Sequence, residues 1–527
     1  MRSTNATNRL ILLAAVAAIV PLTGAVAASG ATYYWDPNHT FTTTGGGIDK
    51  GSAIWDTTSL NWYPGTGSVD VAWPNTGTDV ASFYLPKDYT YVQIGNGDTI
   101  SAQQVEITAY GYTFTGTNTG ANATTLNIAE LTIDPAISGL VANQNSSAFF
   151  NSGTVNITNV DTNGDTNSQT MQVNGAVVNF TGTLGAHLAL NIDAGTLNLN
   201  SAAQMPTATS PGSQIYGGTL NTSVDIATAM PLSRLINTMA FGGGHTLEFS
   251  NASAAPNGNF APNVLVGSTV QFDGNEANST SAQAWTLAKY GPGSLILTGK
   301  YYSYGATTVG LQTVGSTTSP SAGGTLEVDG SFNINTHAGL ASDFVVNNGI
   351  LQGKGTIAGT VTVGNTYATT LGNAVLSAGI GNSLTTGALT FVNNGTTNNA
   401  VYSVDINSST LLSGDVVVNG NLALGNGVAA LNVTDLGSAV LTGGQVFTIL
   451  NPGSGYTTTG YFFGDPTGTN ITVGLNTFTI SYSGGANGNA VTLTSVATNI
   501  PEPATLGLLA VGGLMLLVPR SKRRTGA

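Results

Sequence analysis

Alternating apolar and polar positions dominate the middle of the chain. A short unit recurs there, in which a glycine and a small or β-branched residue are followed by apolar and polar residues in alternation. A period of two predicts a strand with one buried face, and the preceding glycine supplies the turn. Copies follow one another at intervals of roughly 20 to 26 residues. They lie at 153–157, 175–180, 195–199, 218–220, 244–249, 267–272 and 293–297.

The near-constant spacing predicts strands that stack along one axis, because a unit this short cannot bury its apolar face alone. We therefore expect an all-β fold, a right-handed parallel β-helix over residues 121–389, with stacked Asn or Thr ladders on its surface. The alternative fold is a string of antiparallel β-sandwiches. It would place hairpin dipeptides about every 8 to 12 residues, and such spacing is patchy before residue 400.

The pattern changes from about residue 390, where longer alternating segments continue to residue 499. An uncovered last coil would expose strand edges and core side chains. We therefore expect residues 390–499 to form a C-terminal β module that caps the solenoid. Its expected strands are 401–406, 415–418, 429–433, 445–450, 477–482 and 490–494, with turns at Asn419-Gly420, Asn426-Gly427 and Gly484-Gly485.

Aromatic residues concentrate in residues 28–120, which we expect to form the N-terminal cap region. Large aromatic side chains can close the open end of a solenoid, and every solenoid needs such a cap. Flat aromatic faces also stack on sugar rings, so a glycan-binding patch is the alternative hypothesis. Both interpretations concern the same four tryptophans, Trp35, Trp55, Trp62 and Trp73.

The first 27 residues have the pattern of a secretory signal peptide. Arg2 and Arg9 precede the apolar stretch 10–20, and small residues at 25–27 offer a cleavage site. We therefore expect export and removal of residues 1–27.

The C-terminal segment 500–527 carries a second targeting pattern. A charge-free apolar run, 504–518, followed by basic residues predicts membrane insertion with the basic end on the cytoplasmic side. At about 1.5 Å per residue the run spans roughly 22 Å as a helix, against a hydrocarbon core of roughly 30 Å. This length favours a transient transmembrane segment over a permanent anchor. The flanking residues are Pro501, Glu502 and Pro503 before the run and Arg520, Lys522, Arg523 and Arg524 after it.

This tail resembles the PEP-CTERM sorting signal of bacterial exported proteins. The resemblance implies cleavage near Pro501 by a membrane protease of the exosortase type and release to the cell surface or the extracellular matrix. An ordinary C-terminal tail anchor has the same order of parts and is the alternative.

A second resemblance covers residues 289–328. The segment opens with Lys289-Tyr290-Gly291-Pro292-Gly293, continues through Tyr301 and 307–309, and closes with 324–328. This order is similar to the autotransporter-associated β-strand repeat, which implies a parallel β-helix like that of an autotransporter passenger. Residues 311–323 depart from the repeat and are expected to form an inserted Ser/Thr/Gly-rich loop.

Charge and cysteine content narrow the function classes. The chain has 12 Lys and Arg against 25 Asp and Glu, a formal net charge of −13, and half of its basic residues lie in the two terminal segments. An acidic body repels phosphate groups, so we expect no nucleic-acid binding and no peripheral attachment to anionic lipid. Cations and neutral glycans, such as an exopolysaccharide, are the partners that remain. The absence of cysteine excludes disulfides and thiolate metal sites.

Candidate catalytic and metal-binding groups are dispersed. A polysaccharide lyase or glycosidase needs a basic residue or a carboxylate pair, but the body has only one arginine, Arg234, and scattered lysines. Asp161 and Asp165 are expected to lie in a solvated turn. The four histidines are His39, His187, His245 and His337. None of them has a second potential ligand at metal-binding spacing in the sequence. We therefore expect no catalytic residue, metal or cofactor.

The sequence thus predicts an exported, non-enzymatic structural or adhesin-like protein of the cell envelope, the cell surface or the extracellular matrix. The alternative function is a secreted polysaccharide-active enzyme, either a lyase or a glycosidase, on the same β-helix scaffold.

Overall fold

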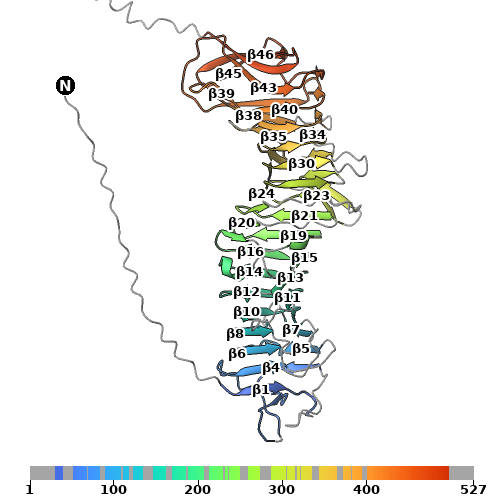
Figure 1. Cartoon of the computed structure of the whole chain (residues 1–527), viewed down its shortest axis with the longest axis vertical. Helices are drawn as coiled ribbons and strands as arrows, with labels where there is room; N and C mark the ends of the chain where they lie inside the picture. The colour runs from blue at the N-terminus through green and yellow to red at the C-terminus, as the bar shows by residue number, and fades with distance from the viewer. Residues whose placement is uncertain are drawn as a thin grey trace, which may run out of the picture.

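The described residues form an elongated stack of strands that runs from β1 (Thr32–Trp35) to β46 (Asn476–Gly484) (Figure 1). Within them there is one 3-10 helix, η1 (Ala202–Gln204), and no α-helix. The computed structural model describes residues 30–497 apart from 40–51, 68, 84–89, 108–110, 118–122, 134–145, 162–168, 186–187, 207–212, 229–231, 236, 250–258, 273–285, 304–305, 315–316, 321, 335–342, 365–371, 381–382 and 394–399.

One sheet of 18 strands follows the whole stack. Each strand pairs in parallel with the next along the axis, except that β3 (Trp62–Tyr63) pairs antiparallel with β1. From β1 onward the sheet continues through β4 (Val80–Phe83), β6 (Thr99–Ile107), β8 (Thr125–Ile133), β10 (Thr154–Asp161), β12 (Val177–Phe180), β14 (Thr196–Leu199), β16 (Thr219–Thr222), β19 (Asn237–Gly242), β21 (Asn259–Val264), β23 (Thr286–Lys289), β26 (Thr307–Val309), β31 (Phe344–Val346), β34 (Val361–Val363), β37 (Leu389–Phe391), β41 (Leu422–Ala423) and β44 (Thr458–Thr459).

A second parallel sheet accompanies the N-terminal half of the stack. Its strands are β2 (Ala53–Trp55), β5 (Thr90–Ile94), β7 (Tyr112–Thr115), β9 (Ser147–Phe150), β11 (Gln169–Val173), β13 (Leu188–Ile192), β15 (Ser213–Ile215) and β18 (Leu232–Leu235).

Two further sheets accompany the C-terminal half. The third consists of β17 (Ile226–Thr228), β20 (Thr246–Phe249), β22 (Thr269–Phe272), β24 (Ser294–Leu297), β29 (Thr325–Val328), β32 (Gly349–Gln352), β35 (Ala374–Ala378), β38 (Ala400–Asn407) and β42 (Ala429–Asp435), with β39 (Leu412–Ser413) antiparallel to β38. The fourth consists of β25 (Lys300–Ser303), β30 (Ser331–Ile334), β33 (Thr356–Ile357), β36 (Ser383–Thr386), β40 (Asp415–Val418), β43 (Val446–Pro452), β47 (Ala490–Val496), β46 and β45 (Asn470–Val473).

Apolar side chains fill the space between these sheets. On successive strands of the first sheet Leu126, Val155, Val178 and Leu197 share one register position, and all four are buried. Because similar residues stack at one position, each rung packs against the next. A single rung therefore has no separate core and depends on its neighbours for burial. The prediction of an all-β parallel β-helix is therefore confirmed, and the parallel pairing rules out a string of antiparallel sandwiches.

The repeated sequence units belong to two different sheets. The four units from 153 to 220 form β10, β12, β14 and β16 of the first sheet, whereas the three units from 244 to 297 form β20, β22 and β24 of the third. Both sheets bury one face and are entered through glycine-led turns, so their sequence patterns are alike. The change occurs where β17 begins the third sheet.

The insertion after Val309 is a hairpin and not a loop. β27 (Leu311–Val314) pairs antiparallel with β28 (Thr317–Pro320) and with no other strand of the described residues. Stacking continues on both sides of the hairpin, since β26 pairs with β31 and β24 pairs with β29. The expectation of a Ser/Thr/Gly-rich loop there was wrong, because residues 311–314 pair with residues 317–320.

The six strands expected in residues 390–499 correspond to β38, β40, β42, β43, β46 and β47. The stacking of the solenoid continues into this part, since β38 and β40 pair in parallel with strands on both sides. Antiparallel pairing of β43 with β47, of β47 with β46 and of β46 with β45 then ends the fourth sheet. The change of strand direction occurs at the end of the stack, where a cap was expected.

Candidate functional site

A ladder of five asparagines runs along the first sheet. Asn127, Asn156, Asn179, Asn198 and Asn221 occupy one register position on β8, β10, β12, β14 and β16, and all are half-buried. From Asn156 onward, the Nδ2 of each donates to the Oδ1 of the asparagine on the preceding rung, at 2.7, 2.7, 2.7 and 2.9 Å. The prediction of stacked Asn or Thr ladders is confirmed here.

The two ends of the ladder differ. At the N-terminal end Asn127 Nδ2 donates to the Ser101 hydroxyl at 3.3 Å. At the other end the residue in register with Asn221 is Gly242, which has no side chain. A ladder that runs in one direction therefore begins at a hydroxyl and ends at the Asn221 carbonyl oxygen.

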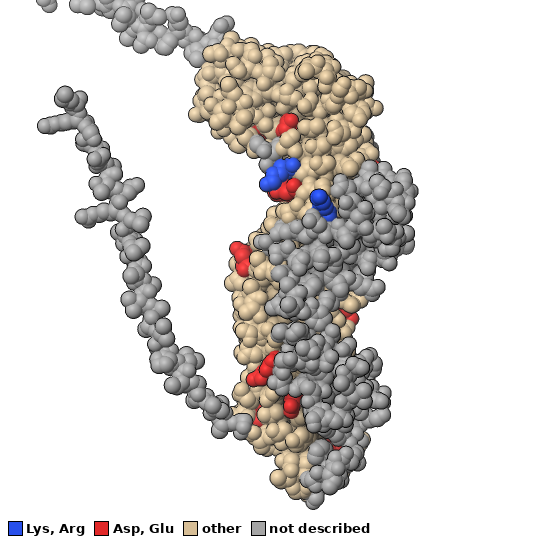
Figure 2. Space-filling model, in the orientation of Figure 1, with Lys and Arg blue, Asp and Glu red and all other residues tan. Residues whose placement is uncertain are grey.

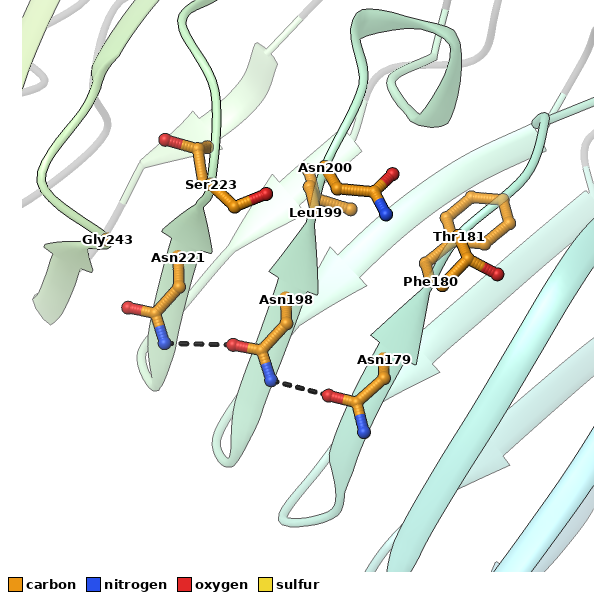
Figure 3. A pocket seen from close by; sticks show the side chains of 10 residues that line it. Asn179, Phe180, Thr181, Asn198, Leu199, Asn200, Asn221, Ser223 and Gly243 are labelled. Atoms are coloured by element: carbon orange, nitrogen blue, oxygen red, sulfur yellow. Dashed lines mark hydrogen bonds between the residues drawn. The ribbon is translucent and has the colours of Figure 1, made fainter.

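A hollow of about 480 Å³ lies beside the last three rungs of the ladder (Figure 3). Figure 3 shows Asn179, Asn198 and Asn221 projecting from the same face of adjacent strands and bonded to one another. The complete lining is Asn179, Phe180, Thr181, Asn198, Leu199, Asn200, Asn221, Thr222, Ser223 and Gly243.

A second column of polar side chains borders the hollow. Thr181, Asn200 and Ser223 each lie two residues after a ladder asparagine, and all three are exposed. Side chains two residues apart share a face of a strand and are separated by roughly 6 to 7 Å. The residues between the two columns, Phe180, Leu199 and Thr222, are buried. The hollow is thus flanked by two polar columns.

The lining offers hydrogen bonds but no charge. Its polar side chains are amides and hydroxyls, and none is an acid, a base or a histidine. The wider surface is also poor in charged groups on the face drawn in Figure 2. Without a titratable side chain this lining cannot supply general acid or base catalysis. It can bind a polar, uncharged molecule.

The four tryptophans of the N-terminal cap region are buried together. Trp35, Trp55, Trp62 and Trp73 are at most 1% exposed. The Trp62 ring centroid lies 5.1 Å from that of Trp35, 5.0 Å from that of Trp55 and 4.8 Å from that of Trp73. A sugar cannot stack on a ring whose faces are covered, so the glycan-binding role expected as an alternative for these side chains does not fit this arrangement. Their burial at the end of the stack agrees with the capping role.

The histidines and acids do not gather into a site. Among the residues with described positions there is no group of three or more His, Asp and Glu that could hold a metal ion. His39 Nδ1 is hydrogen-bonded to Asp70, and His245 Nδ1 lies 3.5 Å from an exposed Asp225. Burial raises the pKa of Asp70, while the hydrogen bond from His39 opposes the rise. His187, His337 and Asp165 lie outside the described residues.

The terminal targeting segments also lie outside the described residues. These are the signal peptide 1–27, the motif Pro501, Glu502 and Pro503, the apolar run 504–518 and the basic cluster that follows it. Within the described part of the chain, no helix has the length and apolarity needed to cross a membrane.

Lys289 is a buried cation that the sequence singled out only as part of a repeat. Its Nζ donates to the carbonyl oxygens of Tyr290, Gly291 and Gly323 at 3.0, 2.8 and 2.8 Å. Burial lowers the pKa of Lys289 to about 7. The bond to Gly323 joins β23 to the segment that follows the hairpin, so Lys289 is a structural clamp.

Comparison with known proteins found no matching family model, no matching curated protein and no matching solved structure. The fold and the polar hollow are therefore the observations from which a function has to be argued.

Proposed function

We propose that this chain is an exported, non-enzymatic structural or adhesin-like protein of the cell surface or the extracellular matrix. The observation that carries the proposal is the uninterrupted 18-strand sheet with its uncharged amide ladder. An elongated β-helix holds groups far apart in fixed positions, which is what a matrix component or an adhesin requires. The polar surface offers hydrogen bonds to a glycan along its length.

The terminal segments support export. The signal-peptide pattern at 1–27 directs the chain out of the cytoplasm, and the PEP-CTERM-like tail holds it briefly in the membrane through 504–518. An exosortase-type protease is the partner that would cleave near Pro501 and release the body. An exopolysaccharide is the partner that the body would then meet.

Cell fractionation tests the sorting part of this proposal. The intact chain is compared with one truncated after Ile500, each followed by immunoblotting of the cytoplasm, membrane, cell surface and medium. The intact chain is expected at the cell surface or in the matrix after passing through the membrane fraction. The truncated chain, which lacks the tail, is expected to miss the membrane fraction. The same distribution for both chains would contradict the proposal.

A second assay tests the non-enzymatic part. The purified chain is incubated with neutral and acidic polysaccharides, and the release of reducing ends and of unsaturated ends is measured. No release above a heat-denatured control is expected. A time-dependent release of either product would favour the polysaccharide-active enzyme instead.

A further inference from the structure

The asparagine ladder has a direction, and no side chain in register continues it beyond Asn221. All four ladder bonds run from Nδ2 on one rung to Oδ1 on the preceding rung, so the amide dipoles are aligned. Aligned hydrogen bonds polarise one another, which strengthens the acceptor at the end of the chain. That acceptor is Asn221 Oδ1, and the next rung offers it only Gly242.

Gly242 and Gly243 lie beside the last rung of the ladder. A Cβ at Gly242 would lie 2.4 Å from Asn221 Oδ1 and 2.9 Å from Leu265 Cδ1. Gly243 has a φ of +100°, and a Cβ there would lie 1.9 Å from the carbonyl oxygen of Thr222. Gly243 therefore has to be glycine, and it lines the hollow with backbone alone.

The dimensions and polarity of the hollow fit a chain of neutral sugars. Rungs are roughly 4.7 to 4.9 Å apart, which is close to the length that one sugar unit adds to an extended polysaccharide. The exposed column of Thr181, Asn200 and Ser223 repeats at that interval opposite the ladder. Hydroxyl and amide groups both donate and accept hydrogen bonds, as sugar hydroxyls do.

Charge selects against acidic glycans. No lining residue is a cation, and the chain as a whole carries a net charge of −13. The last acceptor of the ladder is the amide oxygen of Asn221, which attracts a hydroxyl donor and repels a carboxylate or a sulfate.

We propose that the hollow beside β12, β14 and β16 binds a segment of neutral polysaccharide, with Asn221 Oδ1 accepting a hydrogen bond from a sugar hydroxyl. This site deepens the proposed function, because it names the class of matrix glycan that the protein binds. It rests on the proposed function only in assuming that the protein meets this glycan outside the cell. The site itself depends on the geometry of the three rungs and not on export.

Affinity electrophoresis of the full chain tests the site. Gels contain laminarin or galactomannan as neutral probes and alginate as the acidic comparison. At least one neutral probe is expected to retard the wild-type chain, and alginate is not. Ser223→Ala and Thr181→Val each remove one hydroxyl at the rim, and each is expected to weaken binding roughly threefold to tenfold. Ser383→Ala, at an exposed serine of β36, is the matched control and is expected to bind like wild type.

Gly242→Asn is a further variant, because its side chain would lie directly against Asn221 Oδ1. It is expected to abolish retardation and to lower the melting temperature, because the Asn221 and Leu265 side chains have to move. If this variant misfolds, Ser223→Ala and Thr181→Val decide the question. The site is refuted if neither neutral probe retards the wild type, if alginate retards it equally, or if both hydroxyl variants bind like wild type. Surface delivery in the fractionation experiment is expected to be unaffected by all of these variants, so the two proposals fail separately.

Discussion

Lys289 shows at the scale of one residue how the stack accepts a charge in its core. Its three carbonyl partners favour the ammonium form, whereas burial favours the neutral amine. Burial dominates and brings the pKa to about 7, compared with about 10.4 for a lysine in an unfolded chain. Between these two values the unfolded chain binds more protons than the folded one. The free energy of unfolding should therefore rise with pH in this range.

The substitution Lys289→Met tests this clamp. It leaves the carbonyl oxygens of Tyr290, Gly291 and Gly323 without their donor, so a loss of about 1–3 kcal/mol at pH 9 is expected. Urea unfolding from pH 7 to pH 9.5 should show stability rising for the wild type and flat for the variant. Lys300→Met, at an exposed lysine, is the control that should keep the slope. Equal slopes for wild type and Lys289→Met would contradict the assignment.

The urea series for Lys289 stops at pH 9.5 because tyrosines begin to lose their protons at about pH 10. Burial raises the pKa of Tyr112 and of Tyr402 above the usual value. Above about pH 10 the unfolded chain loses tyrosine protons that the folded chain keeps, so stability should fall as pH rises further. The free energy of unfolding is thus expected to pass through a maximum near pH 10, which a wider urea series would reveal.

Trp62 is the centre of the aromatic core in the N-terminal cap region. Trp62→Ala should lower the free energy of unfolding by about 3–5 kcal/mol, because it removes a tryptophan that contacts three others in a buried cluster. Ile54→Ala, at an exposed residue of the neighbouring strand β2, should change it little. Retardation by neutral glycan should be unchanged in Trp62→Ala at temperatures where it is folded. A variant as stable as wild type would refute the cap.

The sequence predicted the role of the tryptophans but not the burial of Lys289. Clustered tryptophans indicated a cap because their number and position are visible directly in the chain. Which of them keep an exposed face depends on how β1, β2 and β3 meet, and this is a tertiary property that periodicity does not encode. The burial of Lys289 could not be predicted either, because a lysine in an alternating pattern is expected to be exposed.

At the scale of the strand, the asparagine ladder binds neighbouring rungs to each other. Asn198→Ala removes two ladder bonds, one to Asn179 and one from Asn221. A loss of about 1–2 kcal/mol in the free energy of unfolding is expected, since these groups are only half-buried. Asn432→Ala, at an exposed asparagine of β42, is the control. A loss no larger than that of the control would show that the ladder adds nothing to stability.

Asn198→Asp tests the direction of the ladder. An aspartate can accept from Asn221 Nδ2 but, when ionised, cannot donate to Asn179 Oδ1. At pH 7 it should therefore be less stable than Asn198→Ala. Lowering the pH through about 4 protonates the carboxyl group and restores a donor, so the gap to wild type should narrow. A gap that does not depend on pH would contradict the assigned direction.

The repeating strands and an Asn or Thr ladder were predictable because both follow from period-two alternation. Two features of the strands were not. The units at 153–220 and 244–297 look alike but lie in different sheets, since a buried face leaves the same pattern in either sheet. The ladder ends at Asn221 because this residue is in register with Gly242, across β17 and β18, and no local pattern fixes that register.

At the scale of the whole molecule, the parallel β-helix makes the protein long and narrow (Figure 1). A compact protein of 527 residues would have a radius of gyration of about 24 Å. Small-angle X-ray scattering should give a value clearly above this, with a distance distribution skewed as for a rod. A symmetric distribution with a radius of gyration near 24 Å would be incompatible with the stack.

The fold of the whole molecule could be predicted from its repeat spacing, because each rung depends on its neighbours for burial. The destination of the molecule rests on its terminal segments, which act through their sequence and lie outside the described residues.

The mass of the protein recovered from the producing cells tests the central claim, that this solenoid is exported and released by cleavage of both terminal segments. Intact-mass spectrometry of the surface or matrix fraction should give a chain that begins after about Ala27 and ends near Pro501. Recovery of the complete polypeptide from the cytoplasm, with none at the surface, would contradict the account.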